Sequence, residues 1–165
     1  MNRLRVLLCG LALAAAGCGH AVQSLQETWP VGYVDRKLFD EPRYEAFRAG
    51  IDTTKVDGQL AAFIGEARGD ASVLVVFGAW CADSKRGVPR FLSVADAAHF
   101  PASSVRFYSL DRTKESPDGL TEQFGIQRVP TFIFMRGGGE IGRIVESPKT
   151  TLEQDMLAIL APRYD

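Results

Sequence analysis

The sequence predicts an α/β protein in which a mixed sheet of about four strands is covered by helices on both faces. Apolar runs of strand length alternate with segments whose apolar residues recur every three or four positions. A helix between two strands makes those strands parallel, whereas a glycine turn between the last two makes them antiparallel. The 165 residues, 46% hydrophobic and 24% charged, have the composition of a single globular domain.

The first residues differ in character from the rest of the chain. Arg3 and Arg5 precede an uncharged apolar run, residues 6–16, which ends in small residues. This order is typical of a secretory signal, and the run is shorter than the roughly 20 apolar residues of a membrane-spanning helix. Cys18 follows at once, and the stretch resembles the cleavage motif, or lipobox, of bacterial lipoproteins.

The lipobox resemblance implies a signal peptide over residues 1–18, with lipid on Cys18 as the membrane anchor. We therefore expect an exported protein of the cell envelope, either in the periplasm or on the outer surface. A plain secreted protein and an uncleaved anchor are the alternatives.

Residues 19–50 are expected to be a tether and N-terminal extension, and residues 51–165 the folded domain. Prolines interrupt regular structure in the extension. Its one expected helix begins near Pro42 and ends at Gly50, because glycine suits a helix C-terminus.

Two helices and a buried strand are expected in the first half of the domain. Apolar residues from Val56 to Ala67 keep the spacing of one helix face, and Gly69 ends that helix. Residues 72–77 form a continuous apolar run rich in valine, which is typical of a buried strand. Beyond Cys81 the apolar residues return to helical spacing, so the chain changes from strand to helix at this cysteine.

Three more strands and two helices follow. Residues 105–110 alternate as in a strand, and a short helix is expected over residues 120–124 after a polar loop. Residues 131–135 form a second buried strand, which glycines turn into a hairpin with residues 140–145. The last helix is expected to begin with a capping box, formed by Thr150 and Glu153.

Cys81 is the candidate nucleophile. The chain has three cysteines, of which Cys9 would leave with the signal and Cys18 would carry lipid. Unpaired N–H groups and the helix dipole favour a thiolate at a helix start, and a lone cysteine in an exported domain suggests a reactive thiol or an intermolecular partner. A buried structural cysteine is the alternative.

The stretch from Trp80 to Ser84 at this strand-to-helix switch resembles the active-site segment of the thioredoxin superfamily. Pro89 lies where members often carry a helix-kinking proline. Val129-Pro130-Thr131 resembles their cis-proline loop. The resemblance extends from about residue 56 to the C-terminus and implies the thioredoxin fold.

The sequence departs from the family pattern at two positions. Redox-active members have Cys-x-x-Cys, whereas this chain has Ser84 as the fourth residue of the motif. Many thioredoxins bury an aspartate six residues before the first cysteine, where this chain has Val75. Both departures disfavour a fast general disulfide reductase.

The resemblance implies roles for six residues. Cys81 and Ser84 would be catalytic, and Trp80, Val129, Pro130 and Thr131 would contact substrate. Ser84 either donates a hydrogen bond to the thiolate or is a helix-start hydroxyl without a catalytic part. Trp80 covers the sulfur or packs in the core. The Val129–Pro130 bond is expected to be cis, with a trans turn proline as the alternative.

Two functions remain open. The first is a thiol-disulfide oxidoreductase, or isomerase-type enzyme, that acts through Cys81 alone on protein or glutathione disulfides, with an external thiol as reductant. The second is a non-catalytic binding module that uses the groove at Pro130. A net charge of −1 without long basic runs argues against nucleic acid as a partner. We expect no metal or cofactor, because His20 and His99 are far apart and Cys81 lacks a second cysteine, and we expect a monomer.

Overall fold

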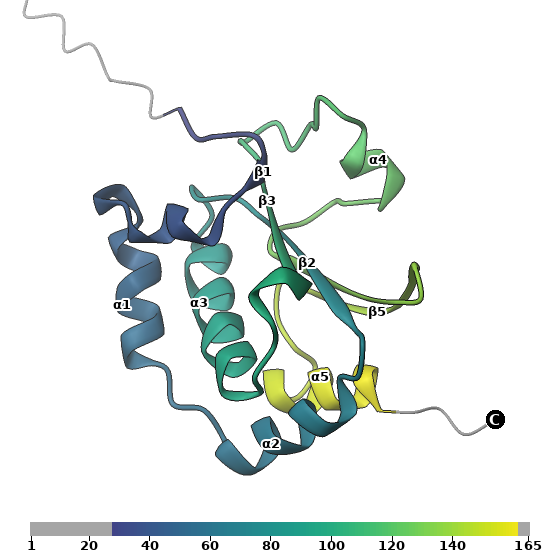
Figure 1. Cartoon of the computed structure of the whole chain (residues 1–165). Coiled ribbons are helices and arrows are strands. Elements are labelled where there is room, and N and C mark those ends of the chain that lie inside the picture. The colour runs from purple at the N-terminus through teal and green to yellow at the C-terminus, as the bar shows by residue number, and fades with distance from the viewer. Residues whose placement is uncertain (1–27, 162–165) are drawn as a thin grey trace, which may run out of the picture.

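The computed structural model describes residues 28–161, which form a five-stranded mixed sheet with helices packed on its faces (Figure 1). The strands lie in the order β1-β3-β2-β4-β5. Their bounds are β1 Gly32–Val34, β2 Ser72–Phe77, β3 Val105–Ser109, β4 Thr131–Arg136 and β5 Gly139–Val145. The helices are α1 Glu45–Thr53, α2 Gly58–Ala67, α3 Ala82–Ala97, α4 Leu120–Gln123 and α5 Leu152–Leu160, with 3-10 turns at Arg36–Asp40, Pro42–Tyr44 and Ala102–Ser104. The expected signal peptide and Cys18 lie outside the described residues.

The three central strands confirm the expected mixed sheet. β2 runs parallel to β3, with Val75 opposite Phe107, because α3 crosses over between them. β2 runs antiparallel to β4, with Val75 opposite Phe132. β4 and β5 form the expected antiparallel hairpin through the glycine turn.

The fifth strand, β1, was not expected. It pairs antiparallel with β3, with Tyr33 opposite Tyr108, so it extends the sheet by one edge strand. Phe39 and Phe47, which follow it in the chain, are buried in the core. The expected boundary between an extension and a domain at residue 50 therefore does not coincide with a break in the packing, because residues 32–47 belong to the same sheet and core.

The expected end of a helix at Gly50 is wrong. Gly50 lies inside α1, and the helix continues to Thr53. A Cβ atom at Gly50 would lie 2.7 Å from the Pro89 Cβ atom of α3. This glycine therefore lets α1 and α3 approach closely, and its role is in tertiary packing.

The expected capping box of the last helix is also wrong by one residue. Thr151 is the N-cap of α5, and its hydroxyl accepts a hydrogen bond from Gln154 N. Asp155 binds the backbone N–H groups of Lys149 and Thr150, which holds these residues outside the helix. Glu153, which the capping box required, is instead buried and forms a 3.1 Å ion pair with Arg90 of α3.

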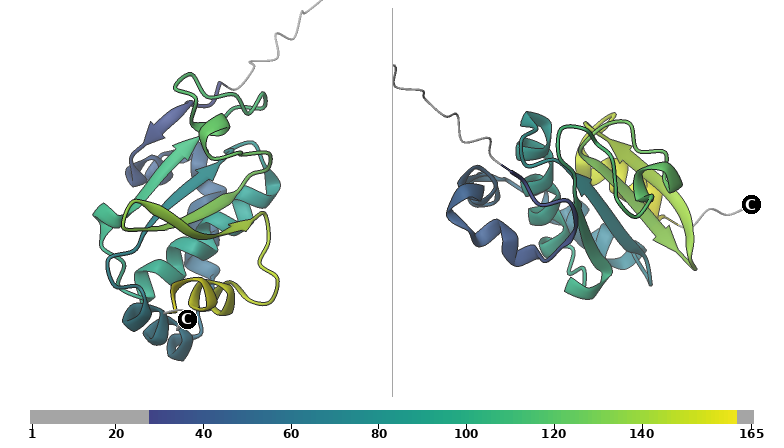
Figure 2. Two further views of the ribbon diagram at one scale, coloured as in Figure 1. Left: turned by 90° about the vertical axis from the view of Figure 1, so that its right-hand side faces the viewer. Right: turned by 90° about the horizontal axis from the view of Figure 1, so that it is seen from above.

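Side chains from the two faces of the sheet form two hydrophobic clusters. We call the first the larger cluster; it joins one face to α1, α2, α3 and α5, and includes Phe47, Phe77, Phe91 and Phe132. The second, the smaller cluster, consists of Leu74, Val76, Tyr108, Leu110, Leu120, Ile126, Val129 and Ile133. Figures 1 and 2 show α1 and α3 on one side of β2 and β3 and α4 on the other. Among residues 28–161, no helix is both long and apolar enough to cross a membrane.

Candidate functional site

Cys81 lies at the junction between β2 and α3. β2 ends at Phe77, and a turn closed by the 2.9 Å hydrogen bond from Cys81 N to Gly78 O redirects the chain. Cys81 has extended backbone angles and is the N-cap of α3, whose first bond runs from Lys85 N to Cys81 O. Its side chain makes no capping hydrogen bond and is half-buried. The thiol therefore faces the end of the sheet, where solvent reaches it.

Trp80 is folded back over this turn. A Cβ atom at Gly78 would lie 2.8 Å from the indole ring, so only glycine leaves room for it. The indole Nε1 donates a 3.0 Å hydrogen bond to the carbonyl oxygen of Leu110, at the end of β3. Trp80 and Cys81 are both partly buried against the smaller cluster. Trp80 therefore combines core packing with a position next to the thiol.

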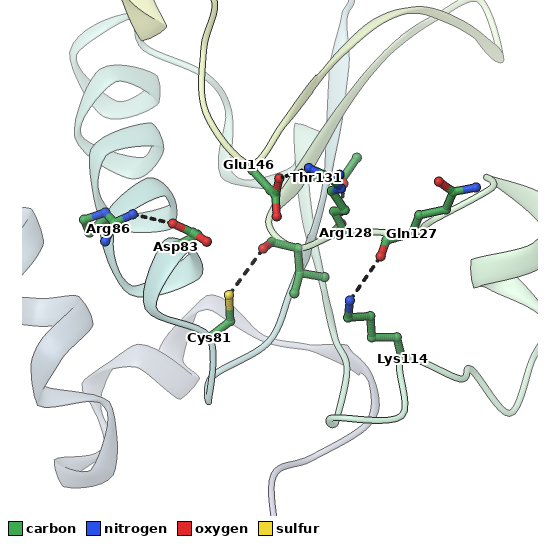
Figure 3. A network of polar contacts seen from close by, with 9 residues as sticks. Cys81, Asp83, Arg86, Lys114, Gln127, Arg128, Thr131 and Glu146 are labelled. Atoms are coloured by element: carbon green, nitrogen blue, oxygen red, sulfur yellow. Dashed lines mark hydrogen bonds and ion pairs between the residues drawn. The ribbon is translucent and has the colours of Figure 1, made fainter.

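The loop before β4 reaches the cysteine from the other side. The Val129–Pro130 peptide bond is cis, as expected. The Cys81 thiol donates to the Val129 carbonyl oxygen at 3.3 Å, which the dashed line from Cys81 marks in Figure 3. A Cβ atom at Gly87 would lie 3.1 Å from Pro130 Cγ, so a glycine on α3 allows this close approach. The expected proximity of Cys81 to Pro130 is thus present.

Polar contacts fix the shape of the cis-proline loop. The buried Thr131 hydroxyl donates to Arg128 O at 2.7 Å, and Glu146 N donates to Pro130 O at 2.7 Å. The Glu146 carboxylate binds the Arg128 guanidinium at 2.8 Å, which raises the pKa of Arg128 (Figure 3). The expected contact residue Thr131 therefore uses its hydroxyl inside the loop.

A shallow cavity lies beside this loop. Its volume is about 300 Å³, and it is lined by Gly125, Gln127, Arg128, Thr131, Arg143, Val145 and Glu146. It gives the cis-proline loop an open groove along the start of β4.

Ser84 is fully buried, and the hydrogen bond of its hydroxyl distinguishes between the two roles expected for it. Its hydroxyl oxygen accepts a 3.2 Å hydrogen bond from Gly78 N. Within residues 28–161, no hydrogen bond joins Ser84 to Cys81. Ser84 therefore ties the first turn of α3 to the turn that precedes Cys81, which is the helix-start role.

Charged side chains surround the cysteine, and sequence reasoning missed two of them. Asp83 pairs with Arg86 on α3, as Figure 3 shows. Arg112 lies over the Trp80 ring at 5.1 Å, and Lys114 donates to Gln127 O at 3.1 Å. Both belong to the polar loop after β3, and no local pattern distinguishes them there. The parallel pairing of β2 with β3 brings this loop to the end of the sheet that carries Cys81.

The position six residues before Cys81 carries no acid. Val75 is fully buried in β2, so the departure expected at this position leaves an apolar core. No group of three or more His, Cys, Asp or Glu side chains in residues 28–161 is arranged to hold a metal ion.

A cysteine that opens a helix at the end of a mixed sheet, beside a cis-proline loop, defines the thioredoxin-like class of proteins. Residues 38–158 match the family described as Thioredoxin, and the chain belongs to this family.

Two thioredoxins of other organisms agree in sequence with this assignment. Thioredoxin from Alicyclobacillus acidocaldarius is 33% identical over 95 residues, which cover 56% of this chain and 86% of that protein. Thioredoxin from Malassezia sympodialis is 32% identical over 87 residues, which cover 52% and 78%. Among solved structures, Trxlp from Edwardsiella tarda matches with a TM-score of 0.41 and 16% identity, over 66% of this chain and 96% of that one.

Proposed function

We propose that the protein exchanges thiols and disulfides through Cys81 alone. The observation that carries the proposal is the half-exposed Cys81 thiol, 3.3 Å from the carbonyl oxygen of Val129 beside the cis-proline loop. It is the one cysteine in residues 28–161, so no second thiol in this part of the chain can form an internal disulfide with it. Family membership implies disulfide-containing proteins as partners in general.

The proposed exchange has two balanced steps. The Cys81 thiolate attacks one sulfur of a substrate disulfide, so a Cys81–substrate disulfide forms and the other substrate sulfur leaves as a thiolate. An external thiol, as its thiolate, then attacks that mixed disulfide and releases Cys81. A hydroxyl cannot displace sulfur near neutral pH, so Ser84 does not take the part of a second cysteine.

The neighbouring residues have supporting roles in this proposal. Val129 and Pro130 hold an extended substrate segment along the loop, since main-chain pairing of this kind gives affinity with little dependence on sequence. Thr131 keeps the loop in shape through its bond to Arg128 O. Trp80 limits access to the sulfur from the side of β3.

A second function is favoured by one observation. Ser84 and Val75 occupy positions where redox-active members carry a thiol and a buried acid, and both are fully buried here. A binding module that holds a disulfide-free segment in the groove at Pro130, without turnover, would keep the loop and need neither group.

Capture of adducts by the wild-type protein tests the two functions. Without a resolving thiol, the mixed disulfide persists until an external thiol arrives, because no intramolecular attack competes. We expect non-reducing gels and intact mass spectra of cell-envelope protein to show disulfide-linked partners or a glutathione adduct on Cys81. Cys81→Ala is the control and should show none. Wild type without adducts would leave the binding module as the better function.

The proposal includes a place in the cell envelope, with lipid on Cys18. It is supported by the charged start, apolar run and small residues of the first 18 positions. The intact mass of the mature protein decides it. A mature N-terminus elsewhere, or an unmodified Cys18, would remove the lipid anchor from the proposal without affecting the chemistry at Cys81.

A further inference from the structure

In residues 28–161, three residues other than glycine have a positive φ angle. They are His99, Lys114 and Glu146, with φ angles of 55°, 60° and 58°. This left-handed conformation places the Cβ atom close to the following carbonyl oxygen, so it is strained in residues other than glycine. Strain of this kind persists only where the surrounding structure holds it, and it is concentrated at functional sites.

His99 differs from the other two in the reason for its conformation. It follows Ala98, the C-cap of α3, and helices often end with a left-handed residue at this position. Its side chain is exposed. Lys114 lies in the loop after β3 and Glu146 follows β5, so the end of a helix does not explain their φ angles.

Lys114 and Glu146 both hold the cis-proline loop, and we call these two residues the loop brace. The Lys114 ammonium donates to Gln127 O at 3.1 Å, and the Glu146 carboxylate binds the Arg128 guanidinium at 2.8 Å (Figure 3). Their strands, β3 and β5, lie on either side of β4 in the sheet. Two strained residues from separate parts of the chain therefore fix two consecutive residues of one loop.

The braced residues lead directly to the carbonyl group that contacts the thiol. Val129 follows Arg128, and its carbonyl oxygen accepts the 3.3 Å hydrogen bond from the Cys81 thiol. Glu146 also fixes the other neighbour of Val129, because the Glu146 N–H donates to Pro130 O at 2.7 Å. The residues on both sides of Val129 are thus held in place.

Stability alone would favour glycine at both positions of the loop brace. Glycine would adopt the same φ angle without strain, and at position 146 it would keep the N–H donor for Pro130 O. The ion pair of Glu146 with Arg128 adds little stability, because the two side chains are 33% and 66% exposed. The Lys114 hydrogen bond likewise ends on an exposed residue, Gln127. The two side chains therefore have a role other than stabilising the fold.

We propose that Lys114 and Glu146 are positioning residues of the Cys81 site, which hold the cis-proline loop in the shape that receives an extended substrate segment. This inference rests on the proposed exchange and adds two residues to it. Within residues 28–161, no hydrogen bond joins either side chain to Cys81. Loss of the loop brace should therefore leave the thiol reactive and slow only the attack on substrates that use the loop.

Two substrates with the same leaving group separate the loop from the thiol. One is an extended peptide of uncharged residues whose central cysteine forms a mixed disulfide with thiopyridine, and the other is a single capped cysteine with the same group. The Cys81 thiolate forms a disulfide with the cysteine sulfur, and thiopyridine leaves as a thiolate, whose release gives the rate constant. Release by Cys81→Ala is subtracted as background. We expect wild type to attack the peptide about tenfold faster than the single cysteine.

The double variant Lys114→Gly with Glu146→Gly removes the loop brace. It removes one positive and one negative charge, so the net charge is unchanged. The peptide-to-cysteine rate ratio should fall close to one, while the single cysteine should react at the wild-type rate. The matched control is His99→Gly, which changes a residue of the same conformation beyond the end of α3 and should keep the ratio. Lys114→Arg with Glu146→Gln keeps a donor and an acceptor, and it should also keep the ratio.

The outcomes separate this inference from the proposed function. No release from the peptide by wild type above the Cys81→Ala background overturns the exchange itself. A wild-type ratio near one, or an unchanged ratio in the double glycine variant, overturns the loop brace and leaves the exchange standing. An equal fall of the ratio in His99→Gly also overturns it. A midpoint temperature of thermal unfolding well below that of His99→Gly would show that the two side chains stabilise the fold, and would overturn their positioning role.

Discussion

The two faces of the sheet are built differently. The larger cluster is covered by four helices and is rich in aromatic rings, such as Phe91 stacked on Phe132 at 5.0 Å. The smaller cluster is covered by the short α4 and by loop residues, and polar contacts such as Tyr108 with Asp118 hold it together. Cys81 and Trp80 pack against the smaller cluster. The face covered by four helices contributes most of the buried core. The face covered by α4 and loops leaves the thiol and its loops accessible.

This difference has a physical reason. In the proposed exchange the Cys81 thiol has to reach a disulfide of another protein, so it must lie where loops and not helices cover the sheet. Stability then has to come mainly from the other face. Substitutions in the larger cluster should therefore mainly lower the free energy of unfolding. Substitutions near the smaller cluster should mainly change the surroundings of Cys81.

The largest effect is expected for Phe91→Ala. Phe91 is fully buried between α3 and β4, and loss of such a ring costs about 3–5 kcal/mol of unfolding free energy. Leu120→Ala in the smaller cluster should cost only ~2 kcal/mol, because loops can close part of the space. Urea unfolding of both variants measures the difference. Equal costs would contradict the division of roles between the two faces.

Gly50→Ala should have the next largest effect on stability. An alanine inside an exposed helix normally stabilises it by about 0.5–1 kcal/mol relative to glycine. At Gly50 the added Cβ meets Pro89 at 2.7 Å, and overpacking against a rigid ring costs about 1–3 kcal/mol. Gly58→Ala at the start of α2 is the control, because nothing lies within 4 Å of its Cβ. The midpoint temperature of thermal unfolding should fall for Gly50→Ala and should not fall for Gly58→Ala.

Ser84→Ala should lower the stability of the fold and leave the rate of exchange at Cys81 unchanged. It removes the acceptor for the buried Gly78 N–H, and an unsatisfied buried donor costs about 1–3 kcal/mol. Ser93→Ala on the same helix is the control, because its hydroxyl donates to Pro89 O and its loss leaves no buried donor. The rate of exchange at Cys81 should stay at the wild-type value in both. A large loss of rate in Ser84→Ala alone would restore a direct role beside the thiolate.

The central strands and α3 were predictable because their side chains are buried in regular patterns. The valine run of β2 and the apolar spacing after Cys81 have few other interpretations. β1 was not predictable, since its three residues become a strand only by pairing with β3. Gly50 was misread for a similar reason: its close neighbour, Pro89, comes from another helix.

The candidate site, too, has residues that were predictable from the sequence and residues that were not. Cys81 and Pro130 were identifiable from their local motifs, and the structure brings them together. The partner of the Ser84 hydroxyl depends on how the turn at Gly78 is folded, so spacing alone left two roles open. The positions of Arg112 and Lys114 depend on the path of a loop after β3, for which the sequence contains no periodic signal.

The smallest expected effect is a pH dependence of stability at alkaline pH, which comes from Tyr108, whose hydroxyl donates to Asp118 at 2.6 Å and anchors the polar loop after β3. Burial and this hydrogen bond raise the pKa of Tyr108 from 10.0 to about 12. The same bond lowers the pKa of Asp118, so both shifts describe one neutral phenol held on one carboxylate. The phenol adds stability in full below the unfolded value of about 10, and that contribution is lost as the pH rises through about 12.

Spectrophotometric titration of the tyrosines in the folded protein measures this shift. We expect one phenol to ionise near pH 12 in wild type, and that step should be missing in Tyr108→Phe. The variant should also lose less stability than wild type between about pH 10 and pH 12, because it has no neutral phenol to ionise. Asp118→Asn sharpens the test, since an uncharged partner destabilises the phenolate less and should lower the ionisation toward the usual tyrosine range. If Tyr108 ionises near pH 10 in wild type, the hydrogen bond to Asp118 does not hold the loop after β3.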